Sequence, residues 1–118
     1  MALMPLESSI SRIGVDIAIV VLSGTLTLGT NLKIVDQQMQ GLIEEGIRKV
    51  VLDLSKVAYA DSAGLGTIVH TYGLLQERGG TLRLGGISER VAALLKMTKT
   101  DTFIPIDPDQ ETSIAALS

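Results

Sequence analysis

Cysteine is absent from this 118-residue chain, and histidine and aromatic residues are rare. Without cysteine there is no disulfide framework and no thiolate chemistry. A single histidine, His70, does not support a structural zinc site. The three aromatic residues (Tyr59, Tyr72 and Phe103) provide no stacking platform for single-stranded nucleic acid. We therefore expect no metal and no cofactor.

Neither an excess of basic charge nor a long apolar run is present. Ten basic and thirteen acidic residues give a formal net charge of -3 with no basic cluster, which disfavours a partner with a phosphate backbone. The longest apolar run, Ile17 to Leu22, has six residues and is too short to cross a bilayer. The opening MALMPLESSIS lacks the charged region and the apolar stretch of a signal peptide. We expect a cytoplasmic protein that binds neither nucleic acid nor membranes.

Aliphatic residues are abundant instead, and their spacing predicts the fold class. Hydrophobic residues make up 46% of the chain, which suits one packed domain over residues 1–118. Strands are predicted at Ser8–Arg12, Asp16–Leu22, Lys49–Leu54, Thr81–Leu84 and Phe103–Ile106, the first two joined as a hairpin at Ile13–Val15. Helices are predicted from a cap at Thr30 or Asn31 to Gly46, over the apolar face Leu65, Ile68, Val69, Tyr72 and Leu75, after a cap at Ser88, and from Pro108 to Leu117. This order predicts an α/β domain with a mixed, mostly parallel sheet of about five strands, a hairpin strand at its edge and about four helices.

The stretch "AYADSAGLGTIV", residues 58–69, joins a predicted strand to a predicted helix and contains a serine, Ser62, whose hydroxyl is a candidate nucleophile. A serine hydrolase would need glycine two residues before the serine, where Ala60 stands. His70 lies roughly 12 Å further along the same helix and does not reach the hydroxyl. Gly64 and Gly66 lack the lysine of a phosphate-binding loop. Neither kind of site is supported.

Two interpretations of Ser62 remain. Either Asp61 or Ser62 caps the helix by accepting its free amide hydrogens, which is the commoner arrangement. Alternatively, Ser62 lies at the positive end of the helix dipole as a phosphorylation site, with the small residues Ala60, Ala63 and Gly64 leaving its hydroxyl accessible. The residues by themselves favour the cap.

The chain also resembles the bacterial anti-sigma factor antagonists of the sulfate-transporter and anti-sigma-antagonist (STAS) domain class. "VVLDLSKVAYADSAGLGTIV" is similar to the strand, Asp-Ser-Ser/Thr-Gly-Leu-Gly motif and helix of that family, and "GGTLRLGGISERVAALLKMTKTDTFIPI" is similar to its next strand, third helix and last strand. The resemblance covers nearly the whole chain. It implies that Ser62 is phosphorylated, with Asp61 as the adjoining acidic residue.

The resemblance also implies a partner and a switch. The unphosphorylated protein would bind an anti-sigma factor that is itself a serine kinase and so free a sigma factor, and a serine phosphatase would reset the cycle. Two residues depart from the family pattern. Ala63 replaces a common second hydroxyl, and Thr27 stands where the family often has a carboxylate at the end of its second strand.

We expect a docking surface around this motif and along the exposed side of the following helix. Its predicted members are Asp61, Ser62, Ala63, Gly64, Thr27, Thr67, His70, Thr71 and Leu74. Two other functions stay open at this point: a constitutive scaffold that assembles with sensors or with copies of itself, for instance as a weak homodimer, and a small-ligand module that binds a nucleotide phosphate at the helix amides. In both of these, Ser62 is only a helix cap.

Overall fold

The structure is a computed structural model that describes residues 4–117. Its elements run β1 (Glu7–Ile13), β2 (Ile17–Leu26), α1 (Thr30–Glu44), β3 (Lys49–Ala60), α2 (Ser62–Glu77), β4 (Thr81–Ile87), α3 (Glu89–Met97), a 3-10 turn (Thr100–Thr102), β5 (Ile106–Asp107) and α4 (Gln110–Leu117). The five strands form one sheet in the order β1-β2-β3-β4-β5. β1 pairs with β2 antiparallel, and the other neighbours are parallel. The predicted α/β class and the edge position of the hairpin strand are confirmed.

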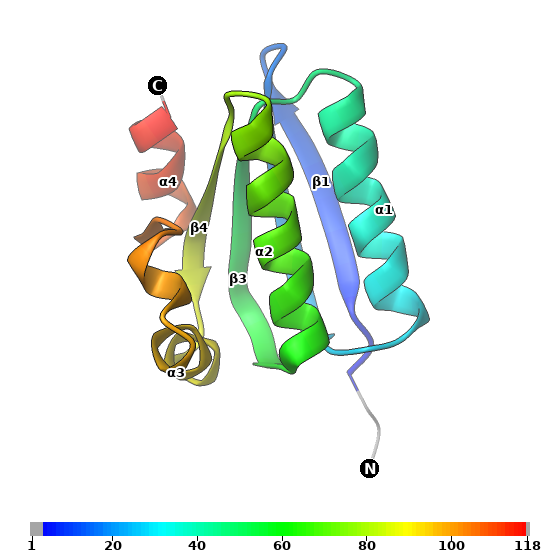
Figure 1. Cartoon of the computed structure of the whole chain (residues 1–118), viewed down its shortest axis with the longest axis vertical. Helices are drawn as coiled ribbons and strands as arrows, with labels where there is room; N and C mark the ends of the chain where they lie inside the picture. The colour runs from blue at the N-terminus through cyan, green and yellow to red at the C-terminus, as the bar shows by residue number, and fades with distance from the viewer. Residues whose placement is uncertain (1–3, 118) are drawn as a thin grey trace.

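Alternating side chains send the strands' apolar residues to two faces of the sheet. One face carries the main core, in which Ala18, Val20 and Leu22 of β2 meet buried residues of α1, α2 and α3. The opposite face holds a smaller cluster of Ile19 and Val51 with Leu117 of α4. Figure 1 shows α1 and α2 side by side over the sheet, with α3 at the lower end of the molecule. The starts of α1, α2 and α3 therefore lie at the same end of the sheet, where the parallel strands have their carboxyl ends.

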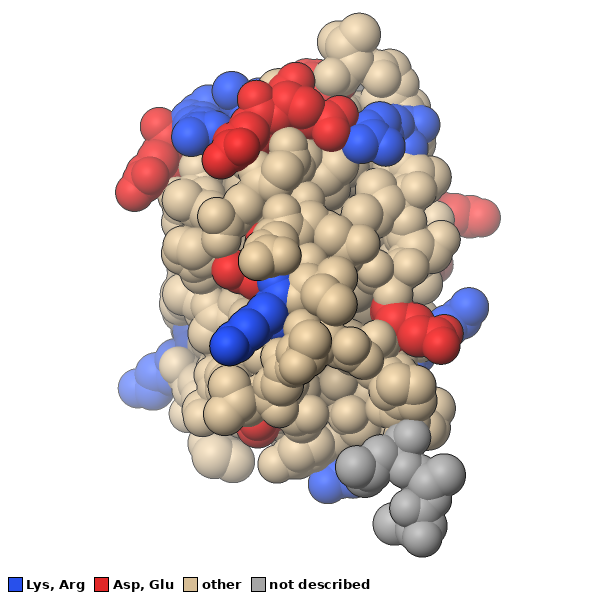
Figure 2. Space-filling view, turned by 90° about the vertical axis from the view of Figure 1, so that its right-hand side faces the viewer, with Lys and Arg blue, Asp and Glu red and all other residues tan. Residues whose placement is uncertain are grey.

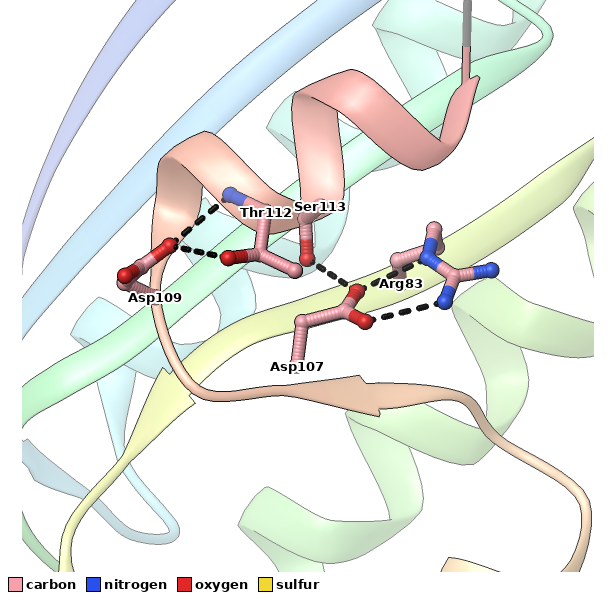
Figure 3. Close-up of polar contacts among 5 residues, drawn as sticks. All are labelled: Arg83, Asp107, Asp109, Thr112 and Ser113. Carbon is pink, nitrogen blue, oxygen red and sulfur yellow. Dashed lines mark hydrogen bonds and ion pairs between the residues drawn. The ribbon is translucent and has the colours of Figure 1, made fainter.

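Polar contacts attach α4 to the sheet (Figure 3). The Arg83 guanidinium of β4 donates to both carboxylate oxygens of Asp107 at 2.8 and 3.0 Å, and the buried Ser113 hydroxyl of α4 donates to the same carboxylate. These donors lower the pKa of Asp107, the guanidinium being the main cause. Asp109 accepts two hydrogen bonds from Thr112 in the first turn of α4. The Asp107 carboxylate of β5 thus links β4, β5 and α4.

Four strands extend further than predicted: β1 by one residue at each end, β4 from Leu84 to Ile87, and β2 and β3 as follows. β2 continues through Gly24, whose φ of 98° suits glycine and whose position would place a Cβ 2.2 Å from the Pro5 carbonyl oxygen. β3 continues from Leu54 to Ala60, because Val57 and Ala60 still point into the core between exposed residues. The strand therefore runs up to Asp61 without a connecting loop.

Predicted boundaries are wrong at two other places. Phe103 is not in a strand: it follows the 3-10 turn and packs against Tyr72 with ring centroids 5.5 Å apart, and β5 begins only at Ile106. α4 begins at Gln110, two residues after Pro108.

The predicted helix caps have a mixed outcome. Gly29 is the N-cap of α1 and makes no side-chain capping bond, so neither Thr30 nor Asn31 caps this helix. Ser88 caps α3 as predicted, accepting from the Val91 N–H at 3.3 Å.

Within residues 4–117, no helix has the length and apolar character needed to cross a membrane.

Candidate functional site

Asp61 is the N-cap of α2, which decides between the two candidate caps. Its Oδ1 accepts from the Gly64 N–H at 2.8 Å, and its Oδ2 accepts from the Leu28 N–H at 3.0 Å. Its own N–H donates to the Leu26 carbonyl at 3.2 Å. One residue therefore caps α2 and ties it to the end of β2 and to the loop that follows.

The electrostatics of Asp61 follow from these bonds. A carboxylate that accepts backbone N–H groups is stabilised in its charged form. The N–H groups of Leu28 and Gly64, in that order, lower the pKa of Asp61. Asp61 is therefore ionised at neutral pH, and its charge lies directly beside Ser62 in the chain.

Gly64 brings the start of α2 into direct contact with β2. A Cβ built on Gly64 would lie 1.9 Å from the Leu26 carbonyl oxygen and 2.8 Å from the carbonyl carbon. Real Cβ atoms do not approach a backbone so closely, so only glycine fits here without a shift of the strand or the helix. Gly64 is buried, and its role in the structure is close packing rather than surface contact.

Ser62 is the first residue of α2 and is exposed to solvent. Because Asp61 makes the capping bond, the interpretation of Ser62 as the cap is wrong. Ser62 lines a shallow pocket between the end of β3 and the helix α3, together with Tyr59, Ala60, Asp61, Arg90, Ala93, Leu94 and Met97. The Arg90 guanidinium carbon lies 5.0 Å from the centre of the Tyr59 ring, in a cation–π contact.

A groove between α1 and α2 adjoins this end of the molecule. Its walls include the predicted docking residues Ala63, Thr67 and His70, and from α1 and the preceding loop Leu28, Leu32, Lys33, Asp36, Gln37 and Gln40. His70 is exposed, with its Nδ1 3.4 Å from Asp36 Oδ1. Figure 2 views the molecule from the side of α1 and β1, where charged side chains gather at the upper end and the lower part is mostly uncharged. Leu28, in the loop before α1, is 75% exposed.

One predicted docking residue, Thr71, does not belong to the exposed side of α2. Thr71 is only 2% exposed, and its hydroxyl donates to the Thr67 carbonyl at 2.9 Å. It lies three residues after Ile68 and four before Leu75, so it shares their buried face. Leu74 is partly buried and packs against the main core. This correction removes Thr71 from the four residues predicted on the exposed side of α2, whereas Leu74 has the same intermediate exposure as Thr67.

Thr27 lies just after β2 and is half-buried. It lines a different hollow from Ser62, with Met4, Pro5, Leu6, Thr25 and the loop Leu28–Leu32. Its link to the motif is indirect: the next residue, Leu28, donates its N–H to Asp61. Among the described residues, no group of three or more histidine, cysteine or acidic side chains is arranged to hold a metal ion.

Sequence reasoning missed Leu28, Tyr59 and Arg90. They are far apart in the chain, yet Arg90 lies over the Tyr59 ring and Leu28 donates to Asp61, because the carboxyl ends of parallel strands lie at the same end of the sheet. That rule identifies the segments that follow β2, β3 and β4 as neighbours, but it does not identify the individual side chains.

A model of the STAS domain matches residues 10–113. The chain belongs to the STAS domain family. The Anti-sigma F factor antagonist of Paenibacillus polymyxa is 28% identical over 101 residues, which is 86% of each chain. The Anti-sigma-B factor antagonist of Bacillus subtilis is 38% identical over 58 residues, which is 49% of this chain and about half, 53%, of that protein.

Solved structures of STAS proteins show the same fold. The anti-sigma factor antagonist SpoIIAA in its unphosphorylated form matches with a TM-score of 0.82 at 14% identity, over 94% of this chain and 96% of that one. The phosphorylated form of the Bacillus protein SpoIIAA matches with a TM-score of 0.77 at 12% identity, over 95% and 100% of the two chains. At such low identity the likeness concerns the fold.

Proposed function

We propose that this STAS protein is a phosphorylation-switched anti-sigma factor antagonist. With Ser62 unmodified it binds an anti-sigma factor serine kinase in the cytoplasm and so frees a sigma factor. Phosphorylation of Ser62 by that kinase weakens the complex, and a serine phosphatase restores it. The protein acts by binding and is not an enzyme. The proposal is supported by the names of its relatives and by the exposure of Ser62 at the start of α2.

One structural observation carries the proposal: the residue that caps α2 is Asp61, and Ser62 is left exposed beside it. A kinase can reach such a hydroxyl, and its modification removes no capping bond. The proposed docking surface is made of Ser62, Ala63, Thr67 and His70, with the α1 side of the groove. Asp61 and Gly64 would act by fixing the start of α2 that carries this surface, and Thr27 through the neighbouring Leu28, whose N–H donates to Asp61.

Phosphate would weaken binding by charge. It adds about -1.5 to -2 charges next to the ionised Asp61. A partner would have to desolvate this charge, and an imperfectly paired buried charge costs about 2–5 kcal/mol at an interface. The corresponding loss of affinity is roughly thirty- to several-thousand-fold.

The test uses purified protein with ATP and candidate anti-sigma factor kinases. We expect mass spectrometry to place one phosphate on Ser62, and none in Ser62→Ala. Ser11→Ala is the matched control, because it removes an exposed hydroxyl on β1, outside the proposed docking surface. Calorimetry with the kinase in the absence of ATP should show that Ser62→Ala binds with the same affinity as the parent. Ser62→Asp should bind more weakly but stay folded. Equal binding by Ser62→Asp, or a phosphate on another residue, would contradict the proposal.

The nucleotide-binding alternative is less well supported, because the Asp61 carboxylate already occupies the Gly64 N–H that an anion at the start of α2 would use. Assembly into a scaffold or a weak homodimer stays a prediction, and light scattering over a range of protein concentrations tests it.

A further inference from the structure

The pocket beside Ser62 contains one cationic side chain. Its charged lining residues are Asp61 and Arg90. Both oxygens of Asp61 are taken by backbone N–H groups, and the Asp61 carbonyl accepts from the Leu65 N–H. Part of the hydrogen-bonding capacity at the start of α2 is therefore used by Asp61. A phosphate on Ser62 would find fewer free amides than an uncapped helix offers.

Arg90 is placed to supply what the amides lack. It is the second residue of α3, it is exposed, and its guanidinium lies over the Tyr59 ring at 5.0 Å. Tyr59 lies at the end of β3, three residues before Ser62. Stacking on an aromatic ring restricts a long side chain and leaves the edge of the guanidinium free to donate, and that edge matches the geometry of a phosphate.

We propose that Arg90 is the intramolecular phosphate-binding residue of this switch: when Ser62 carries a phosphate, the Arg90 guanidinium pairs with it and changes its contact with Tyr59. The ligand is thus the protein's own phosphomonoester. This proposal rests on the proposed modification of Ser62. Its consequence is that modification alters the pocket at Tyr59 and Arg90 as well as the charge of Ser62.

The experiment installs phosphoserine at position 62 during translation, so it needs no kinase. The second pKa of a phosphoserine is ordinarily about 6, and a paired cation favours the dianion. In ³¹P NMR titrations we expect that pKa to be lower in the parent than in Arg90→Gln by about 0.3 to 0.7, the size expected of an exposed ion pair. Arg90→Lys, which keeps the charge and loses the planar fork, should lie between them. The exposed Glu89 and the ionised Asp61 are the same in all of these proteins.

Lys33→Gln is the matched control, because Lys33 lies in the groove between α1 and α2 rather than in the Ser62 pocket. It should leave the phosphate pKa unchanged. The Tyr59 ring resonances should shift on phosphorylation in the parent and stay in place in Arg90→Gln. Urea unfolding of the unmodified variants checks that each is folded.

The proposal is overturned if Arg90→Gln and the parent have the same phosphate pKa, or if Lys33→Gln changes it as much as Arg90→Gln does. Neither result would touch the proposed function, which is tested by kinase and binding assays. Conversely, a Ser62 that no kinase modifies would remove the proposed function even where the installed phosphate pairs with Arg90.

Discussion

Replacing Gly64 with alanine tests how the start of α2 is packed. The new Cβ would lie 1.9 Å from the Leu26 carbonyl oxygen, an atom of the backbone that cannot rotate away. Either α2 or the end of β2 must move. Such overpacking typically costs about 1–3 kcal/mol. The same movement would weaken the capping bond from Asp61 to the Gly64 N–H, and the loss of an N-cap costs about 1 kcal/mol. We expect Gly64→Ala to lower the free energy of unfolding by about 2–4 kcal/mol.

Gly66→Ala is the matched control for this substitution. It makes the same chemical change two residues further along α2, but nothing lies within 4 Å of its Cβ. Alanine is favoured over glycine inside a helix by about 0.5–1 kcal/mol, so Gly66→Ala should be neutral or stabilising. Urea unfolding followed by circular dichroism measures both variants. Equal destabilisation of the two, or a Gly64→Ala variant as stable as the parent, would refute the close contact between α2 and β2.

Two further predictions concern the helix face and the pH dependence. Ile68→Ala should destabilise the protein by about 2–5 kcal/mol, and Leu74→Ala, at a partly buried position, by about 1–2 kcal/mol. Equal unfolding free energies in urea for Leu74→Ala and the parent would show that Leu74 does not pack against the core. The pKa values of Asp61 and Asp107 are lowered in the folded protein. These two carboxylates therefore stabilise the fold at pH values above their unfolded pKa of about 3.9, and this contribution is lost as the pH falls through their folded pKa values. The free energy of unfolding should therefore decrease below about pH 4, and the decrease should be smaller in Asp107→Asn; an unchanged acid profile in that variant would contradict the role of the Arg83 pair.

Much of the fold could be predicted from the sequence, because aliphatic residues recur at strand and helix spacing between glycine breaks. The predicted end of β3 at Leu54 was wrong because Ser55 and Lys56 interrupt the apolar run and point to solvent, although Val57 and Ala60 return to the core. Phe103 resembled a strand residue, yet its ring packs on Tyr72, a tertiary contact that no local pattern contains.

The site was predictable in part, for similar reasons. The sequence located the strand–helix junction but left the choice between Asp61 and Ser62 open, since both residue types cap helices. The bond that distinguishes them runs from the Gly64 N–H to Asp61, and the same carboxylate also accepts from the Leu28 N–H, thirty-three residues earlier in the chain, a contact that no local pattern contains. Thr71 is a different case. Its spacing from Ile68 and Leu75 already indicated the buried face, and its polarity concealed this, because the hydroxyl is satisfied within the helix by the Thr67 carbonyl.

The separation of roles between Asp61 and Ser62 bears on how a phosphate could act here. A serine that capped α2 would lose its capping bond on modification, and the fold and the switch would then be coupled. In this structure the cap is Asp61, so the charge of Ser62 can change while the bonds to Leu28 and Gly64 persist. Those same bonds keep Asp61 ionised, so the new phosphate would lie beside an existing negative charge. The arrangement favours a modification whose effect falls on a docking partner and on Arg90 rather than on the stability of the domain.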